Sequence, residues 1–331
     1  MKLVRADGTV AWDENGVNKI EGFSRNQPEI DRTKLRDILI DAVQPESIKW
    51  GKKLDRVEPE GKKYTLHFAG GEVVSGFDLV VGADGAWSKV RALVTDEKPF
   101  YSGITVLDLT AVEVIKNHQW LSEYAGAGSL FMFDDGRAIV CQRNGGDKIR
   151  VYACVRQPET ILEDCGIDWE QPAADATKLW VEKFFADCGE DLKRAVVEAS
   201  DILVPRALWM MPVGTKWEPR AGITLLGDAA HLMTPFAGVG VNTAMADALD
   251  LAKALLKRKD AFGASVEANI VDALKEYEEP MFVRGQQMME RTYEGLKGHF
   301  SSHGIDERLH KLSRRAKMIE EAKKARISAT A

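Results

Sequence analysis

The stretch from residue 222 to residue 256 holds the groups best suited to chemistry in this chain. A short apolar run over 223–226 ends at Gly227 and Asp228, and a turn rich in proline and glycine follows at 235–240. Glycines at a helix start leave backbone N–H groups open to a ligand, and the aligned peptide dipoles favour negative charge there. The pattern therefore predicts an anion-binding turn beside a carboxylate that can accept hydrogen bonds from a polyol.

A helix is expected directly after this turn, because apolar residues recur at three- and four-residue steps. These positions are Val241, Ala244, Ala248, Leu251 and Leu255. For a lone Gly-x-Gly such as Gly238 and Gly240, an ordinary strand, loop and helix would be the favoured interpretation. The full string is far more specific. It resembles, almost position for position, the second flavin-contacting motif of the aromatic-hydroxylase class of FAD-dependent monooxygenases.

Two further strings agree with this resemblance. Residues 84–91, Asp-Gly-Ala-Trp-Ser-Lys-Val-Arg, resemble the family's D-G motif, which lies near the flavin and the path of the nicotinamide nucleotide. Arg32, followed by Leu35 and Leu39, resembles the R-x-x-L-x-x-x-L helix whose arginine touches the flavin. Within the family, residues 28–39, 88–91 and 227–238 look most like the tetracycline-inactivating flavin monooxygenases. The resemblance covers most of residues 1–300.

The resemblance implies FAD as cofactor, with NADPH or NADH and dioxygen as co-substrates. It implies a flavin C4a-hydroperoxide as the oxygen-transferring species, so no side chain is required as an acid or base. The cofactor-binding residues that it implies are Arg32, Asp84, Gly227, Asp228, Pro235, Gly238, Gly240, Val241 and Asn242. Phe236 would contribute to an apolar wall of the substrate pocket, and Asp108 falls near a glutamine that grips substrate in the tetracycline-degrading relatives.

Several residues in these motifs also have plainer interpretations. His231 is expected to order the loop after Asp228 rather than to move protons. Asp84 is equally suited to a structural turn, and Trp87 to packing. Arg137 and Arg143 align too loosely with substrate-gripping residues of the relatives to be given a role.

The chain departs from the family at its start. The family begins with a strand, a G-x-G-x-x-G turn and a helix that hold the ADP half of FAD, a unit of roughly 30 residues. No such motif opens a helix near this N-terminus. We expect that this unit lies outside the chain rather than having been lost, and that residues 1–331 alone bind FAD poorly or need a segment that completes the sheet.

Composition limits the classes of function. With 331 residues, 45% of them hydrophobic, the chain can form one large or two modest domains. A formal charge of −6 argues against nucleic acid as a partner. Neither a membrane span nor a signal peptide is indicated, and neither the four cysteines nor the six histidines show metal-ligand spacing. We expect a cytoplasmic protein without a metal, monomeric when complete, that acts on a small molecule.

The elements that must position these motifs predict an α/β fold. We expect a doubly wound FAD-binding domain, incomplete at its N-terminus, with an inserted antiparallel β-sheet substrate domain and C-terminal helices. The expected boundaries are 1–98 and 212–264 for the two parts of the FAD-binding domain, 99–211 for the sheet and 265–331 for the helices. Asp31 is expected to cap a helix over 28–39, and short strands are expected near 48–50, 53–58, 64–68 and 78–83.

The leading hypothesis is a monooxygenase that hydroxylates an aromatic or polyketide-like molecule, with tetracycline among the candidates. One alternative is a truncated, non-catalytic module that keeps the flavoprotein fold for binding, which the missing N-terminal unit would favour. Another is an epoxidase or reductase of the same superfamily. The unbroken string at 227–242 favours the enzyme.

Overall fold

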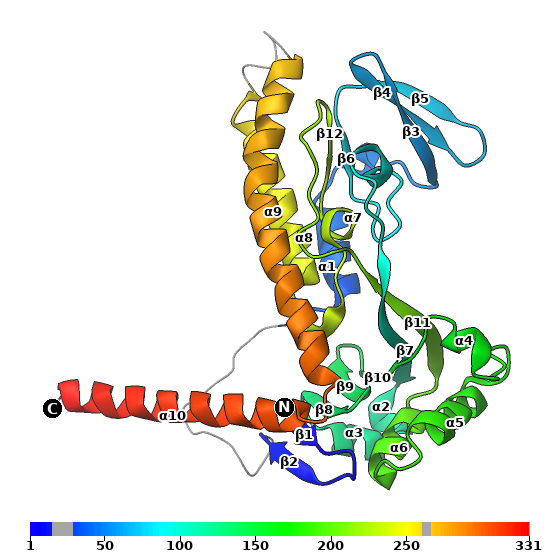
Figure 1. The fold of residues 1–331 in the computed structure, drawn as a ribbon, viewed down its shortest axis with the longest axis vertical. Helices are drawn as coiled ribbons and strands as arrows, with labels where there is room; N and C mark the ends of the chain where they lie inside the picture. The colour runs from blue at the N-terminus through cyan, green and yellow to red at the C-terminus, as the bar shows by residue number, and fades with distance from the viewer. Residues whose placement is uncertain (15–28, 260–265, 331) are drawn as a thin grey trace. The chain divides into compact units, whose positions relative to one another are not determined.

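The computed structural model describes residues 1–14, 29–259 and 266–330 of the chain (Figure 1). The chain divides into two compact units. The first unit is formed by Met1–Ala42, Gly103–Leu208 and Lys297–Ala331. The second unit is formed by Val43–Ser102 and Trp209–Leu296.

A seven-stranded sheet organises the first unit. Its strand order is β11-β7-β10-β9-β8-β1-β2. The strands are β1 (Lys2–Val4), β2 (Val10–Asp13), β7 (Phe100–Val112), β8 (Ser129–Asp134), β9 (Arg137–Asn144), β10 (Lys148–Arg156) and β11 (Ile202–Met210). Strands β7 to β10 pair antiparallel, which confirms the expected antiparallel sheet inserted in an α/β chain.

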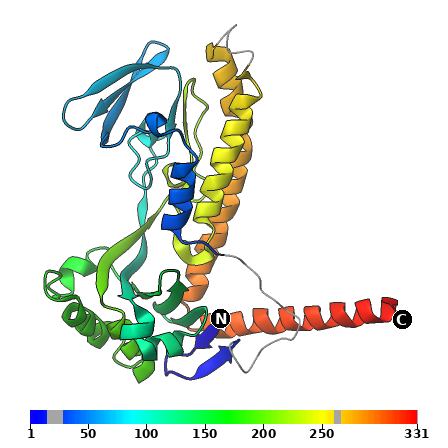
Figure 2. The same ribbon diagram turned by 180° about the vertical axis from the view of Figure 1, so that it is seen from behind.

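Helices cover one face of this sheet (Figure 2). The first unit contains α1 (Arg32–Asp41), α2 (Val114–Asn117), α3 (Gln119–Ala125), α4 (Ile161–Asp164), α5 (Ala173–Phe184), α6 (Glu190–Glu198) and α10 (Gly304–Thr330). Alternate strand residues such as Leu107, Leu109 and Val151 are fully buried and pack against Trp180 and Leu192 of the helices. Because strand side chains alternate between faces, the residues between them lie on the opposite face of the sheet.

The second unit contains two small sheets and two long helices. Strands β6 (Val80–Gly82) and β12 (Ile223–Leu225) pair in parallel, as expected for a buried strand before each motif. A separate antiparallel sheet consists of β3 (Leu54–Glu60), β4 (Lys63–Phe68) and β5 (Val73–Phe77). The helical segments are η1 (Pro45–Ser47), η2 (Arg91–Leu93), α7 (Asp228–His231), η3 (Pro235–Ala237), α8 (Gly240–Leu256) and α9 (Val266–His299). Helices α8 and α9 run side by side (Figures 1 and 2).

Polar side chains from the middle of α9 fasten β12 in the core of the second unit. The Tyr277 hydroxyl donates a 2.8 Å hydrogen bond to the carbonyl oxygen of Leu225. Glu278 Oε1 accepts hydrogen bonds from Thr224 Oγ1 at 2.7 Å and from Trp217 Nε1 at 3.0 Å. Glu278 has no exposed surface, and burial raises the pKa of its carboxyl although both hydrogen bonds oppose the shift. The core of this unit therefore favours a neutral carboxyl at Glu278.

Two local expectations from the sequence change in the structure. The strand expected at 48–50 is wrong, because Pro45 begins the 3-10 turn η1 and Gly51 turns the chain with a φ of 74°. Asp31 precedes α1 but makes no cap hydrogen bond; its Oδ1 instead accepts hydrogen bonds from Asn144 Nδ2 and the Gly145 N–H. At the N-terminus, β1 and β2 pair as an antiparallel hairpin.

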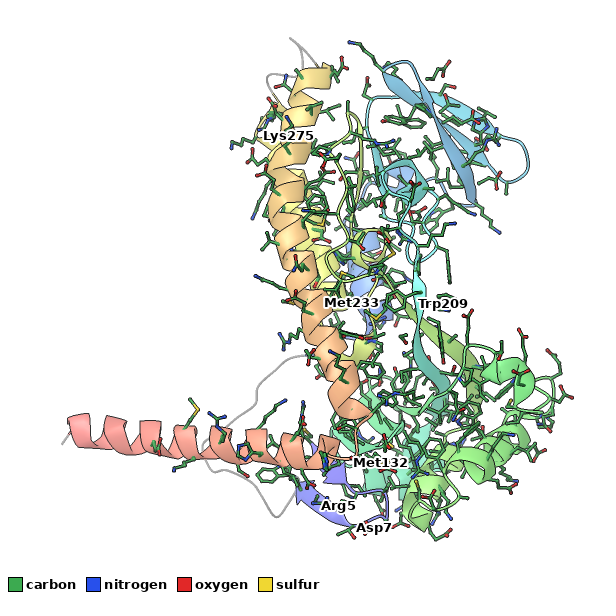
Figure 3. The ribbon with its side chains drawn as sticks, in the orientation of Figure 1. Arg5, Asp7, Met132, Trp209, Met233 and Lys275 are labelled. Atoms are coloured by element: carbon green, nitrogen blue, oxygen red, sulfur yellow. The ribbon has the colours of Figure 1, made fainter. Side chains whose placement is uncertain are left out.

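The hairpin also joins the sheet of the first unit. Strand β1 pairs in parallel with β8, with Lys2 opposite Leu130. Arg5, labelled in Figure 3, binds Asp306 of α10 at 2.7 Å. These contacts group residues 1–42 with the inserted sheet, whereas the sequence assigned 1–98 to one part of a FAD-binding domain. The expected boundaries of the FAD-binding and substrate domains stay a prediction, because a compact unit need not coincide with a functional domain.

Among the described residues, no helix is long and apolar enough to cross a membrane, and no cluster of three or more histidine, cysteine or acidic side chains could hold a metal ion.

Replacing Glu278 with glutamine tests the neutral carboxyl. A raised folded-state pKa contributes stability that is full below the ordinary value of 4.5 and is lost as the pH rises through the raised value. Glutamine keeps the acceptor oxygen and carries no charge. In thermal unfolding, we expect the Tm of Glu278→Gln minus the Tm of the wild type to increase by about 2–4 °C as the pH rises from about 5 to about 8. A Tm difference that stays constant over this range would contradict the assignment.

Candidate functional site

The site begins where β12 meets the turn at Gly227. This residue has a φ of 57°, a conformation that favours glycine. A Cβ on Gly227 would lie 3.1 Å from the Cβ of Ala244 on α8, closer than ordinary packing. The positive φ and the short distance to Ala244 both require a glycine at position 227. Because Gly227 has no side chain, the start of α7 can lie against α8.

A buried carboxylate on α8 holds this junction. Asp247 has no exposed surface, and its Oδ2 accepts the Gly227 N–H at 3.0 Å and bonds His231 Nε2 at 2.6 Å. Its Oδ1 accepts two hydrogen bonds from Arg284 of α9, at 2.9 and 3.3 Å. Burial alone would raise the pKa of Asp247, but the hydrogen bonds and positive charge of its partners outweigh burial and lower it. Asp247 is therefore held as an anion inside the protein.

His231 orders the loop, as the sequence analysis expected. The residue is 3% exposed, and its ring packs so closely on α9 that a Cβ on Gly285 would lie 3.2 Å from its Cδ2 atom. The Nε2 atom is engaged by Asp247. The ring thus faces the protein interior and is not presented to a ligand.

Asp228 shows the opposite environment. It is the first residue of α7, it is exposed, and its carboxylate makes no hydrogen bond within the part of the chain that the structure describes. Its backbone carbonyl, by contrast, is held by Arg91 at 2.8 Å. The main chain at Asp228 is therefore fixed while its side chain remains available as an acceptor.

The turn before α8 leaves backbone donors open. Added Cβ atoms on Gly238 and Gly240 would meet nothing within 4 Å. The first bond of α8 joins the Thr243 N–H to the Val239 carbonyl at 3.0 Å, and no side chain caps the helix. The N–H groups of residues 240–242 have no acceptor among the described residues. A bare helix start of this kind fits a ligand with negative or carbonyl oxygen atoms, as a flavin ring presents.

Asp84 has a structural role in the D-G loop. Its Oδ2 accepts the backbone N–H groups of Lys89 at 2.7 Å and Val90 at 3.4 Å. Trp87, expected to pack, is 61% exposed and meets Trp209 edge to face, with ring centroids 5.1 Å apart. Trp209, labelled in Figure 3, packs with Met233 against a small buried cluster. The D-G loop therefore presents an aromatic ring to solvent.

Arg91 joins the D-G loop to the loop after β12. Arg91 is 4% exposed, and its guanidinium donates to the carbonyls of Ala229 at 2.7 Å and Asp228 at 2.8 Å. It also donates to the carbonyl of Ala86 at 2.8 Å. Only a planar fork with donors on several nitrogens can hold carbonyls from both loops at once. Arg91 therefore fixes the two motifs relative to each other.

The structure brings most of the expected site residues into the second unit. These are Asp84, Gly227, Asp228, Pro235, Phe236, Gly238, Gly240, Val241 and Asn242. Pro235 and Phe236 form the short η3 segment just before the open turn. Arg32, exposed at the start of α1, and Asp108, buried on β7, belong to the first unit.

The two loosely aligned arginines of the first unit are structural. Arg137 binds Asp134 and Asp187, each at 2.5 Å. Arg143 donates to the carbonyl oxygens of Gly126 and Ser122, each at 2.8 Å.

Asp247 and Arg284 were missed by the sequence analysis. The expected apolar stripe of α8 included Val241, which is 39% exposed. The buried residues of the helix are Thr243, Asp247, Leu251 and Ala254. The missed signal is an acidic residue four positions before Leu251, which places it on the same face of the helix as that buried leucine. An acidic side chain there requires a buried partner, which α9 supplies.

Comparison with known proteins finds a family match, related sequences and solved structures of similar fold. Residues 63–292 match the family described as FAD binding domain. Monooxygenase penA from Penicillium thymicola is 30% identical over 338 residues, covering 89% of this chain and 78% of penA. Klebsiella pneumoniae HpxO, solved with FAD and uric acid, has a TM-score of 0.66 at 20% identity over 86% of this chain and 67% of its own. Tetracycline destructase Tet(51) has a TM-score of 0.59 at 19% identity over 96% and 77%.

The Asp247 network can be tested with two aspartates that share one partner. Asp247→Asn removes a buried charge, so we expect the free energy of unfolding to fall by about 3 kcal/mol. Asp250 binds the same arginine at 2.7 Å but is 35% exposed, and Asp250→Asn should cost less than about 1 kcal/mol. Denaturant unfolding measures both. Because folding lowers the pKa of Asp247, this residue contributes to the free energy of unfolding above pH 3.8, its ordinary pKa. The contribution is lost as the pH falls through the lowered pKa of the folded state. Equal effects of the two variants would refute the network.

Proposed function

Because this chain belongs to the FAD-binding-domain family of FAD-dependent monooxygenases, we propose that it hydroxylates an aromatic or polyketide-like small molecule with NAD(P)H and dioxygen. One observation carries the proposal. The N–H groups at 240–242 and the exposed Asp228 carboxylate have no partner among the described residues, whereas the backbone next to them is held by Asp247 and Arg91.

The residues present fit FAD. The N–H groups of Gly240, Val241 and Asn242, with the dipole of α8 behind them, would hold the pyrimidine side of the ring, where negative charge gathers on reduction. Asp228 would accept hydrogen bonds from the ribityl hydroxyls. When bound, FAD supplies the redox chemistry that lets reducing equivalents from NAD(P)H and dioxygen place one oxygen atom on the substrate.

The remaining residues would shape the surroundings of the ring. Pro235 and Phe236 would form an apolar wall that excludes water. Asp84 has only its Oδ1 free for a cofactor contact, because Oδ2 is taken by the loop itself. Its role is therefore mainly to shape the D-G loop.

The reductant and the substrate belong to the same proposal. NAD(P)H would approach along the D-G loop, where the exposed ring of Trp87 offers a surface for stacking. Tetracycline is one candidate substrate among fused-ring phenols and polyketides, since a tetracycline destructase shares the fold. We propose a monomeric protein acting in the cytoplasm, where NAD(P)H is available.

A turnover assay tests the function directly. We expect the flavin-loaded protein to oxidise NADPH or NADH with oxygen uptake that an aromatic substrate stimulates, and to yield a product heavier by one oxygen atom. An oxygen electrode and mass spectrometry of a panel of fused-ring phenols, tetracycline included, would measure this. Gly240→Val fills the open space above the N–H groups and should lower turnover by about 100-fold or more. Ala252→Val adds the same side chain at an exposed position of α8 and should not.

Removing the Asp228 carboxylate tests its place at the cofactor. Asp228→Ala deletes a charged acceptor worth about 1.5–3 kcal/mol, so the Kd for FAD should rise roughly 10- to 100-fold. Flavin fluorescence titration measures the change. Asp272→Ala removes an exposed carboxylate from α9 and serves as the matched control. An Asp228→Ala variant that binds FAD as tightly as this control would exclude Asp228 from the site.

A further inference from the structure

The buried carboxyl of Glu278 takes no part in the chemistry proposed for the site. Glu278 has no exposed surface, and its Oε2 atom has no hydrogen-bond partner among the described residues. None of the charged side chains in that part of the chain acts on it. Because an unpaired anion with an unsatisfied oxygen is costly in a protein interior, this geometry favours the protonated carboxyl.

The charged side chains closest to this part of the core are paired with one another. Arg284 of α9 binds Asp247 and Asp250 of α8, at 2.9 and 2.7 Å. All three act on the hydroxyl of Tyr277, the chain neighbour of Glu278. The pKa of Glu278 itself is raised by burial and lowered only by its two hydrogen bonds.

The elements that Glu278 contacts present no charge to it. Strand β12 contains no charged residue. Lys216 and Glu218, which flank Trp217 in the chain, are both exposed. Burial and hydrogen bonding therefore govern the protonation of Glu278.

Glu278 and Tyr277 hold two consecutive residues of β12. Glu278 Oε1 accepts the Thr224 hydroxyl at 2.7 Å, and the Tyr277 hydroxyl donates to the Leu225 carbonyl at 2.8 Å. Within the described residues, β12 pairs with β6 alone. The side chains of α9 thus supply polar contacts to β12 that no second strand provides.

Strand β12 leads directly into the loop that carries Asp228. The N–H of Leu226 donates to the Gly82 carbonyl at 2.9 Å, and Gly227 and Asp228 follow. Thr224 lies four positions before Asp228 in the chain. A displacement of β12 would therefore be transmitted to Asp228 through a few residues of main chain.

We infer that Glu278 is a positioning residue for the cofactor, acting in its protonated form through Thr224 on the placement of Asp228. The inference rests on the proposed function, because it requires FAD to bind against Asp228 and the start of α8. Ionisation would put an unpaired charge in the core, and the carboxylate would be stabilised only if water entered between α9 and β12. FAD affinity is then full while Glu278 keeps its proton and falls as rising pH removes it.

A pH profile of FAD affinity in the whole chain tests this. By flavin fluorescence titration, the Kd of the wild type should rise about threefold to tenfold from about pH 5.5 to about pH 8.5. Glu278→Gln keeps the acceptor oxygen and does not titrate, so its Kd should vary by less than about twofold over this range. Glu276→Gln is the matched control on α9. Its carboxylate pairs with Lys257 and Arg258, which lower its pKa, so the wild-type profile should be kept.

Thr224→Val gives a second, directional test. The hydrogen bond from Thr224 lowers the pKa of Glu278, so its removal should move the midpoint of the profile to higher pH. A Thr224 hydroxyl with only a structural role would instead change the Kd by the same factor at every pH. Amide hydrogen exchange of residues 225–228 measures the loop without FAD. Exchange in the wild type, relative to Glu278→Gln at the same pH, should increase as the pH rises.

A wild-type profile as flat as that of Glu278→Gln overturns the inference, as does a Glu278→Gln profile as steep as the wild type. Equal loop exchange in the two proteins at every pH overturns it as well, whatever the affinity for FAD. These outcomes are independent of turnover. A protein that hydroxylates with a flat profile would refute only the inference, and one that shows the profile but never hydroxylates would refute only the proposed function.

Discussion

Asp247 is a carboxylate without exposed surface on which three groups from two other segments of the second unit, α7 with its cap and α9, converge. The backbone of Gly227, the ring of His231 and the guanidinium of Arg284 lie 20, 16 and 37 residues away along the chain. A buried charge is tolerated only when its hydrogen bonds are complete, so each of these groups is constrained by the others. The loop after β12 has its shape because the interior of the unit requires it.

This constraint sorts the polar groups of the second unit into two sets. Asp247, His231, Arg91 and Glu278 are buried and face partners within the protein. The Asp228 carboxylate and the N–H groups that open α8 face outward without partners among the described residues. Polar groups whose backbone is fixed by buried partners, and whose donors or acceptors face solvent, are preorganised for a ligand, because binding need not first rearrange them. Arg91 extends the same support to the D-G loop by holding carbonyl groups on both sides.

The first unit follows the same division on a sheet. Arg137 and Arg143 lie at strand positions that a sequence alignment could mistake for substrate contacts, yet their donors are used within the fold. Arg150 and Arg206 share one acceptor and keep donors to spare. Whether all donors of an arginine are engaged inside the fold therefore depends on how many acceptors the neighbouring strands provide.

Local pattern alone determined much of this protein. The strand before Gly227, the glycine turn, the helix from Gly240 and the alternation of the inserted sheet all follow from residues within a few positions of one another. The family resemblance followed from the same short strings, so the expected cofactor did as well. Only the tertiary structure decided that Asp31 binds Asn144 rather than capping a helix, and that Asp247 holds the loop after β12 from within the core. Each of these outcomes depends on which partner the fold brings to a polar side chain, and hydropathy and spacing along the chain carry no information about a partner tens of residues away.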